Sequence, residues 1–549
     1  MVNSSKVGER EYHPRIYEPI VLGMGLVLAI FGAIIGMELI SRVGINPNTS
    51  IIGALIAIAF SYIPIEIARR VRNIHRINLM QTVISGATFQ AGNVILLTIA
   101  VPYLLGLVEG AYFYGVVIGV LIAGLIDILL ANWIFDSPFY PARNPWPPGV
   151  ATAEAIKAAI GKGKRALLLL YGMIFGGALT YLGYPGDVVG ITLITQIVAI
   201  TAFGIGLILR AYGPQLIGID LFKIYAPQGI MVGAGIAALI QFVILYMKVR
   251  KEGKKASQNT PGSALVTGIS TTIVTADVAL RRMVLALVMW IIGAFITGVL
   301  TGLNGSMNPV LFIIWALYTG FQAWFTTLIC GLSGMYAGWF PAFATALASL
   351  VISLLLGFPP LAAGISVAYV AATGPGMADL SYDLKTGWIL RGEGKDPDFE
   401  RIGRRWQFYA KVLSLAIALI LVMIFYRAYF EALKLFPPAS RTLAATAEAV
   451  ADPQLARWLL TWAPLGFILQ LIGGPERQIG ILLATGLMIM NPPAGIAVLV
   501  TVAARLILIK IYGVEKLRDI FYVGGAGAVG GSAIISFIVY TLRAYLGLK

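Results

Sequence analysis

Two carboxylates stand four residues apart in the segment 374–387, Gly-Pro-Gly-Met-Ala-Asp-Leu-Ser-Tyr-Asp-Leu-Lys-Thr-Gly. On a helix Asp379 and Asp383 would share one face, with Lys385 close by. Such a pair could hold Mg²⁺ and a phosphate group, which makes a membrane-embedded Mg-dependent transferase the alternative function. A second acidic cluster facing the first would be expected of that enzyme, and the sequence contains none. A helix cap with an ion pair at the membrane surface is the structural reading of the same segment. We expect Asp379, Asp383 and Lys385 to lie at a helix end, to point into protein rather than lipid, and to belong to the substrate path.

Three further carboxylates lie in or beside long apolar stretches: Glu38, Asp127 and Glu154. An ionisable group at membrane depth is costly and is a functional-site hypothesis by default. We expect one of the three to carry a coupled proton. Glu154 is preferred, because a helix N-terminus and Lys157 favour its ionised form while desolvation opposes it. The structural alternative is ion pairing, of Glu154 with Lys157 and of Asp127 with a buried Arg or Lys.

The segment 144–149, Asn-Pro-Trp-Pro-Pro-Gly, forces a break between two apolar stretches. Proline removes a backbone donor and bars the preceding residue from helical geometry. Irregular backbone at membrane depth is tolerated only where it is buried in protein or lines a watery cavity. The segment 491–495, Asn-Pro-Pro-Ala-Gly, resembles the first and also opens a helical run. We therefore expect both to approach one central cavity, with Asn144, Trp146 and Asn491 in the substrate path.

A run of hydrogen-bonding residues begins a third apolar stretch at 85–93, Ser-Gly-Ala-Thr-Phe-Gln-Ala-Gly-Asn. Polar groups in lipid are costly unless they are paired, so Thr88, Gln90 and Asn93 should face protein or water. Hydrogen bonds between helices would explain one or two of them. Because there are several, we also expect them to line a substrate cavity.

Two glycine- and alanine-rich runs, 226–235 and 522–531, each follow one of the Pro/Gly breaks. Small residues let helix backbones approach closely in a membrane. The alternative is that their bare backbone faces a permeation path, which would place Gln228 in the substrate site. Since a Pro/Gly break followed by a glycine-rich run occurs twice in the same order, we expect two related halves, 1–260 and 261–549.

The composition indicates an integral membrane protein. The chain has 549 residues, of which 58% are hydrophobic and 12% charged, whereas soluble domains have about 25% charged residues. Its net charge of +15 does not indicate nucleic acid, because the cations form short clusters between apolar stretches, as in cytoplasmic loops. One cysteine, two histidines and the absence of a Walker A motif give no sign of a metal centre, a cofactor or direct use of ATP.

Apolar stretches long enough to span a bilayer, with shorter interrupted ones between them, predict an all-α polytopic protein with about 16 passages. Several of these should be broken or re-entrant helices. The basic loop at 69–76 follows two spans, so it lies on the same side as the N-terminus. The positive-inside rule then places both in the cytoplasm of a multi-pass plasma-membrane protein. Homo-oligomerisation stays open at this stage.

These motifs resemble the oligopeptide transporter (OPT) superfamily, in particular its prokaryotic and archaeal branch related to the yellow-stripe-like metal-chelate carriers. The segments that carry the resemblance are 44–54, 85–92, 144–158, 226–235, 379–387 and 521–528. Among them, Pro-x-Pro-x-Gly-x-Ala-x-Ala-Glu after Asn144 and Asp-Leu-Lys-Thr-Gly at 383–387 are the specific elements. Two positions depart from the family pattern. Ala87-Thr88 stands where the family often has Glu-Ser, and Tyr382 replaces the usual Gln.

The resemblance implies a secondary transporter rather than an enzyme. Its cargo would be small oligopeptides or peptide-like metal chelates, carried inward together with protons across the lipid bilayer. Because the family's acidic group is missing at position 87, any coupling role it has must move to another carboxylate, such as Glu38 or Glu154. A channel is a weaker possibility, because a long chain with internal similarity does not require a pore shared between subunits.

Overall fold

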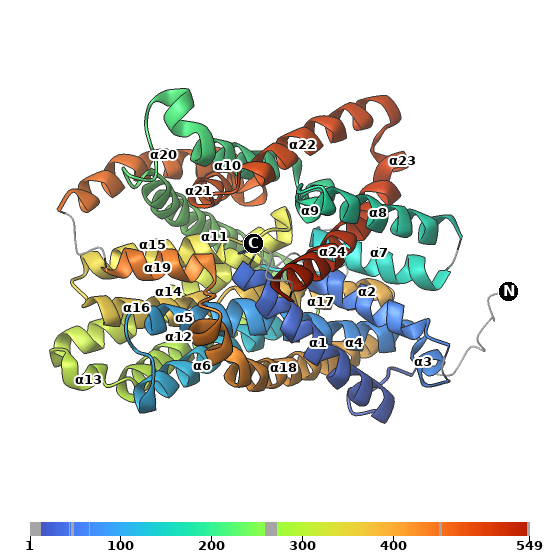
Figure 1. Cartoon of the computed structure of the whole chain (residues 1–549), viewed down its shortest axis with the longest axis horizontal. Helices are drawn as coiled ribbons and strands as arrows, with labels where there is room; N and C mark the ends of the chain where they lie inside the picture. The colour runs from blue at the N-terminus through green and yellow to red at the C-terminus, as the bar shows by residue number, and fades with distance from the viewer. Residues whose placement is uncertain are drawn as a thin grey trace.

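A computed structural model gives the arrangement of the chain for residues 12–42, 44, 49–64, 66–161, 163–258, 272–448 and 453–545 (Figure 1). Within these ranges every regular element is a helix. Eleven helices are long and apolar enough to cross a membrane, and four shorter apolar helices accompany them. These features confirm the predicted polytopic all-α fold. Part of the motif at 44–54 and the first residues of a weak predicted span at 264–280 lie outside the described residues.

The helices of the first part of the chain are α1 (Pro19–Arg42), α2 (Thr49–Ser61), α3 (Glu66–Val71), α4 (Ile74–Phe89), the π-helix η1 (Gln90–Leu96), α5 (Leu97–Leu104), α6 (Gly110–Ile134), α7 (Pro147–Gly161), α8 (Lys164–Tyr181), α9 (Gly186–Ile194), α10 (Ile197–Ile217) and α11 (Ala226–Gln258). Those of the second part are α12 (Ala276–Leu300), α13 (Leu303–Ser306), α14 (Pro309–Ala337), α15 (Ala342–Leu355), α16 (Pro360–Ala371), α17 (Pro375–Leu390), α18 (Pro397–Arg427), η3 (Ala428–Ala432), α19 (Pro438–Glu448), α20 (Pro453–Arg477), α21 (Ile479–Met488), α22 (Pro492–Tyr512), α23 (Val514–Asp519), η4 (Ile520–Gly524) and α24 (Gly525–Tyr545).

Proline sets the starting point of many of these helices. It opens α7, α14, α16, α17, α18, α19 and α22. At the first helical position its missing N–H costs nothing, and its fixed φ is already helical. The segments that the sequence singled out for their prolines are thus the points where helices begin.

Several helices are interrupted within single apolar stretches. The apolar stretch 187–209 forms two helices, because the chain breaks at Thr195 and Gln196, and the Gln196 side chain caps α10. A second break separates α16 from α17, where Gly374 has φ +91°. A third lies before α21, where Gly474 has φ +69°. Glycine adopts this left-handed region without the steric cost that other residues have.

Glycine also brings pairs of helices into backbone contact. In α11, a Cβ added at Gly233 would lie 1.8 Å from the carbonyl oxygen of Ala463 in α20. In α24, a Cβ at Gly531 would lie 1.9 Å from the carbonyl oxygen of Met173 in α8. The two glycine-rich runs are therefore packing surfaces for neighbouring helices, as the small-residue pattern predicts.

Helix α17 occupies the middle of the molecule. It packs against α2, α4, α6, α7, α14 and α18, and each of its residues from Pro375 to Gly387 is buried. Figure 1 shows α1, α4 and α18 along the lower side of the molecule and α10, α20, α21 and α22 along the upper side. A helix surrounded on every side by protein can carry charged residues that no lipid-facing helix could accommodate.

Replacing Gly36 of α1 with alanine is expected to destabilise the protein, because the new Cβ would lie 1.9 Å from the backbone oxygen of Thr88 in α4. Overpacking typically costs about 1–3 kcal/mol, and here a backbone atom rather than a movable side chain blocks the site. Gly23→Ala in the same helix is the control, since nothing lies within 4 Å of its Cβ position. Thermal unfolding in detergent should show a lower midpoint for Gly36→Ala alone. Equal midpoints for the two variants would contradict the close α1–α4 contact.

Candidate functional site

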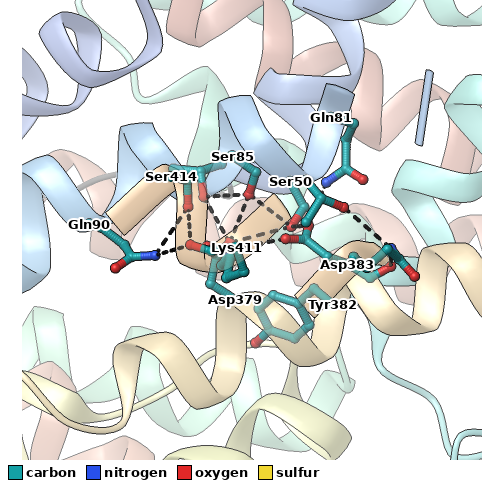
Figure 2. Close-up of polar contacts among 12 residues, drawn as sticks. Ser50, Gln81, Ser85, Gln90, Asp379, Tyr382, Asp383, Lys411 and Ser414 are labelled. Atoms are coloured by element: carbon teal, nitrogen blue, oxygen red, sulfur yellow. Dashed lines mark hydrogen bonds and ion pairs between the residues drawn. The ribbon is translucent and has the colours of Figure 1, made fainter. Parts of the chain in front are cut away.

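Lys411 of α18 places its ammonium group between the two carboxylates of α17 (Figure 2). Its Nζ atom lies 2.8 Å from Asp383 Oδ2 and also contacts Asp379 Oδ2. All three side chains are buried. As predicted, the i, i+4 spacing puts both carboxylates on one face of a helix, and both point into protein. We call Asp379, Asp383 and Lys411 the charged triad.

Hydroxyl groups from α2 and α4 bind the second oxygen of Asp379. Thr49 Oγ1 donates to Asp379 Oδ1 at 3.0 Å, and Ser85 Oγ donates to the same atom at 2.9 Å. Thr49 is the first residue of α2, while Ser85 lies near the end of α4. The Asp379 carboxylate therefore ties α17, α18, α2 and α4 together at one point.

Asp383 is bound in the same manner, but partly by an amide. Ser50 Oγ donates to Asp383 Oδ1 at 2.7 Å, and Gln81 Nε2 donates to the same oxygen. The backbone oxygen of Asp383 accepts a further bond from Gln407 Nε2 at 2.7 Å. Both carboxylates thus have hydrogen-bond partners on each oxygen, as buried charges require.

With both carboxylates ionised and Lys411 protonated, the charged triad would carry one negative charge in excess. Lys385, on the same helix, turns its ammonium group elsewhere: Nζ donates to the carbonyl oxygens of Ala142 at 2.7 Å and Asn144 at 3.1 Å. An excess charge in a dry interior is costly, and binding a proton to one carboxylate removes that cost.

The break before α7 is held against α17 by these contacts of Lys385. Trp146 in the break is buried with φ +39°, a strained conformation for a bulky residue. Its backbone N–H donates to Met335 O at 2.8 Å and its ring Nε1 donates to Pro141 O at 3.0 Å. The half-buried Asn144 side chain contacts the Tyr336 hydroxyl at 3.3 Å. The break is therefore held against the protein by Trp146, while Pro145 is exposed.

Helix α7 starts in direct contact with α17. A Cβ at Gly149 would lie 2.7 Å from both Tyr382 O and Lys385 Cβ, so only glycine permits this approach. The Thr386 hydroxyl donates to Gly149 O at 3.0 Å. The two most specific sequence motifs, Pro-Pro-Gly and Asp-Leu-Lys-Thr-Gly, thus form one interface.

Asp127 of α6 caps α17 from a neighbouring helix. Its Oδ2 accepts from the backbone N–H of Met377 at 2.9 Å, and its Oδ1 accepts from Thr327 Oγ1 at 2.7 Å. Negative charge at a helix N-terminus is stabilised by the helix dipole and the free N–H groups. The expected structural alternative, pairing with Arg or Lys, is not the contact that the side chain makes.

The other two predicted coupling residues lie in ion pairs away from the charged triad. Glu154 contacts Arg165 of α8 and lies 3.4 Å from Lys157 Nζ. Glu38 contacts Arg42 one turn later in α1, and Tyr429 donates to it at 2.6 Å.

The polar residues of the third apolar stretch lie beside the charged triad. Gln90 Nε2 donates to Ser414 Oγ at 3.2 Å and to Lys411 O at 3.3 Å (Figure 2). Thr88 donates to Ile84 O within its own helix and packs against the glycines of α1. Asn93 is half-buried in η1. A π-helical turn such as η1 frequently marks a functional site.

Two predicted site residues lie in other parts of the fold. Asn491 caps α22, where its side chain accepts from Ala494 N at 3.1 Å, and α22 packs against α9 and α10. Gln228 is buried near the start of α11, and its Oε1 has no hydrogen-bond partner.

A cavity of about 160 Å³ adjoins the glycine-rich run of α11. Its walls come from α11, α14, α15 and α21 and are mostly apolar. Gln322, Thr345 and Ser349 supply the polar groups. Met231 and Gly235 belong to the wall, so this run faces a hollow as well as a helix.

The segment before α1 folds back onto the start of α4. His13 is buried there, with its ring 5.2 Å from that of His75 and 5.4 Å from that of Phe399. Burial lowers the pKa of His13 to about 3, and the nearby Arg391 acts in the same direction. His13 is therefore neutral at physiological pH and does not titrate with a cellular proton gradient.

Sequence reasoning missed the residues that complete the site. Lys411 is the central one, and the others are Thr49, Ser50 and Gln81. Lys411 did carry a signal, since it is one of two cations in the apolar stretch 408–430, and the other, Arg427, lies near its far end. Intramembrane cations are as costly as the intramembrane acids that the sequence did single out. The hydroxyl donors had no such signal, because Thr and Ser are common in membrane helices.

An all-helical membrane protein whose broken helices surround a buried charged site is typical of secondary transporters. Residues 20–222 match the family model described as OPT oligopeptide transporter protein. The match covers less than half of the chain and confirms the resemblance seen in the motifs. No curated protein matches the chain.

The protein is therefore a multi-pass membrane transporter rather than an enzyme. The alternative of a Mg-dependent transferase is not supported. Asp379 and Asp383 are occupied by Lys411. Within the described residues no group of three His, Cys, Asp or Glu side chains could hold a metal ion.

Replacing Lys411 with methionine is expected to cost about 3–5 kcal/mol of stability, because it leaves two buried carboxylates without their ammonium partner. The triple variant Lys411→Met, Asp379→Asn, Asp383→Asn should regain much of this loss. Lys395→Met, at an exposed position, is the control. Thermal unfolding followed by size-exclusion chromatography would measure all three. A Lys411→Met protein as stable as the control would contradict the buried ion pairs.

Proposed function

We propose that the protein imports small oligopeptides or peptide-like metal chelates across the plasma membrane together with protons, with its N-terminus in the cytoplasm. Transport follows from the family match and the fold. What we propose beyond this is the coupling to protons, the inward direction of transport and the class of substrate. A relation to the yellow-stripe-like metal-chelate branch belongs to the same proposal, because the match over residues 20–222 does not distinguish branches.

The observation that carries the proposal is the connection that α17 makes between the broken helix and the charged triad. Lys385 holds the backbone of Ala142 and Asn144, while two residues earlier in α17 Asp383 contacts Lys411. A shift of the break before α7 must therefore displace the helix that carries the carboxylates. Coupled transport requires this property: substrate and ion must act on one two-state element.

The substrate path would run along the irregular backbone around α7 and the polar start of η1. Asn144, Trp146 and Lys385 border the break, and Gln90 and Asn93 belong to η1. Thr88 lies two residues before η1. Gln228 near the apolar cavity and Asn491 at the start of α22 would act later in the path. A substrate with apolar side chains suits the mostly apolar walls of the cavity.

We also propose two related halves, with a pairing that differs from the one expected from the motifs. Helix α8 packs along α24 and α11 packs along α20, while α9 contacts α22 and α10 contacts α21. If α8, α9, α10 and α11 are matched in that order with α20, α21, α22 and α24, each of these contacts corresponds to another of them. The break before α22 then corresponds to the one before α10, because Asn491 and Gln196 cap their helices alike. The break before α7 corresponds to Pro437-Pro438 before α19, because α7 packs on α17 as α19 packs on α5.

Uptake by proteoliposomes under an imposed pH gradient tests the proposal. The panel would contain di- to pentapeptides and peptide-like metal chelates, each with and without a protonophore. At least one class should accumulate above its external concentration, and the protonophore should reduce this to equilibration. Equal uptake with and without the gradient would contradict proton coupling, and no uptake of either class would contradict the substrate assignment.

Lys385→Met should slow transport at least tenfold in a folded protein, because the break before α7 loses its attachment to α17. Lys395→Met, which removes an exposed ammonium group five residues after α17 ends, is the matched control. Initial rates of uptake at saturating substrate would be compared. Unchanged rates for Lys385→Met would rule out the α7–α17 connection as the coupling element.

Glu154→Gln should lower the rate of uptake but leave its dependence on the pH gradient intact. Glu154 is already paired with Arg165 and Lys157, so we propose that it acts as an ion pair between α7 and α8 rather than as the proton carrier. Asp127 would likewise keep a structural role as the cap of α17, and Glu38 would keep one as the ion-pair partner of Arg42. If Glu154→Gln abolished gradient-driven accumulation while exchange of substrate continued, Glu154 would be the coupling residue instead.

A further inference from the structure

We propose that Asp383 is the residue that binds the transported proton. We also propose that the hydrogen bonds of the amide pair Gln81 and Asn78 reverse direction when Asp383 is protonated. The inference rests on the proposed function and extends it to one carboxylate and its partners. It begins with the one negative charge that the charged triad would have in excess with both carboxylates ionised.

Asp383 fits the role better than Asp379. Three hydroxyl groups surround Asp379 Oδ1, at 3.0 Å from Thr49, 3.4 Å from Ser50 and 2.9 Å from Ser85. Hydroxyl donors of this kind stabilise the ionised form. Asp383 has a single hydroxyl partner on Oδ1, and its other partner there is the amide of Gln81. An amide can donate with nitrogen or accept with oxygen, so it can also serve a protonated carboxyl group.

A chain of amide hydrogen bonds leads away from Asp383 along α4. Gln81 Nε2 donates to Asp383 Oδ1, and Gln81 Oε1 accepts from Asn78 Nδ2 at 3.0 Å. The chain ends at Asn78 Oδ1, which is buried and has no hydrogen-bond partner. A buried acceptor without a partner costs about 1–3 kcal/mol, so it requires an explanation.

Protonation of Asp383 would give this acceptor a donor. A proton from the aqueous side forms an O–H bond on Asp383 and neutralises its pair with Lys411, which stays bound to Asp379. With the Gln81 amide turned over, the new O–H donates to Gln81 Oε1. Gln81 Nε2 then faces Asn78, whose amide turns so that Oδ1 accepts. Both amide oxygens accept a hydrogen bond in this arrangement, and the Asn78 Nδ2 group takes the place that Oδ1 held. Release of the proton on the other side restores the first arrangement.

The other ionisable groups around α17 make their contacts with groups other than Asp383. Asp127 of α6 caps the N-terminus of α17, and Lys385 binds the backbone before α7. Arg391 forms a two-point pair with Glu400, at 2.7 and 2.9 Å. Helix α14 contributes the thiol of Cys330, which packs against Gly374. Helices α2 and α4 bring hydroxyls and amides to the triad, and the hydroxyl of Tyr382 points away from it (Figure 2).

Infrared difference spectroscopy of the protein in lipid tests the assignment without any substrate. Lowering the pH should produce the carbonyl band of one buried protonated carboxyl group. Asp383→Asn should remove this band. Asp379→Asn should retain it at a lower pH, because Asp383 then has Lys411 to itself. A band that survives in Asp383→Asn and disappears in Asp379→Asn, or that persists in both, would overturn the assignment.

The amide pair is tested by Asn78→Leu and Gln81→Met. Each removes the acceptors that the protonated form uses, so the band should appear at a pH lower by about one unit, a tenfold loss of proton affinity. Thr98→Val is the matched control, because Thr98 is equally buried on the same transmembrane stretch and bonds only the backbone of its own turn. An unchanged midpoint in both amide variants would overturn the role of the pair. If the band behaves as expected but no substrate is transported with protons, the proposed function fails and the proton site stands.

Discussion

The contact of one lysine with two aspartates in the centre of the molecule constrains much of the rest of this structure. Lys411, Asp379 and Asp383 are buried, so lipid cannot approach them and every neighbouring helix must supply polar partners. α2 supplies hydroxyls, α4 supplies a hydroxyl and an amide, and α18 supplies the ammonium group. The close approach of these helices requires glycine at the crossing points, such as Gly53 and Gly86. Charge burial and small-residue packing are therefore two aspects of one arrangement.

The irregular backbone follows from the same constraint. Helix α17 begins at a break that Asp127 caps, and α7 begins at a break that Lys385 holds. In each case a buried charge satisfies backbone groups that a continuous helix would have satisfied itself. The breaks before α7 and α17 can change conformation at a lower free-energy cost than a regular helix, because few backbone hydrogen bonds have to be broken. We therefore expect movement at the ends of α7 and α17 rather than within them.

Much of the fold could be predicted from the sequence, whereas the site could be predicted only in part. Apolar length and proline positions indicated the spans and the helix starts. Asp379, Asp383 and the break at Asn144 were each recognised as informative, but their contact was not predicted. Lys411 was missed because it lies 28 residues from Asp383 in another apolar stretch, and nothing local reveals which helices meet. Asn491 was placed with Asn144 on the likeness of their Pro-Pro motifs, and in the structure it caps α22, which packs on α9 and α10. Pairing between distant helices is a tertiary property that local patterns do not encode.

The central claim is that substrate and proton move together through a site governed by the charged triad. The most direct measurement follows the internal pH of proteoliposomes that contain a trapped pH-sensitive dye, with no pH gradient at the start. Addition of a transported peptide or chelate outside should acidify the interior, and the Asp383→Asn protein should equilibrate the substrate without acidification. Substrate entry in the unmodified protein with no change of internal pH would contradict the account.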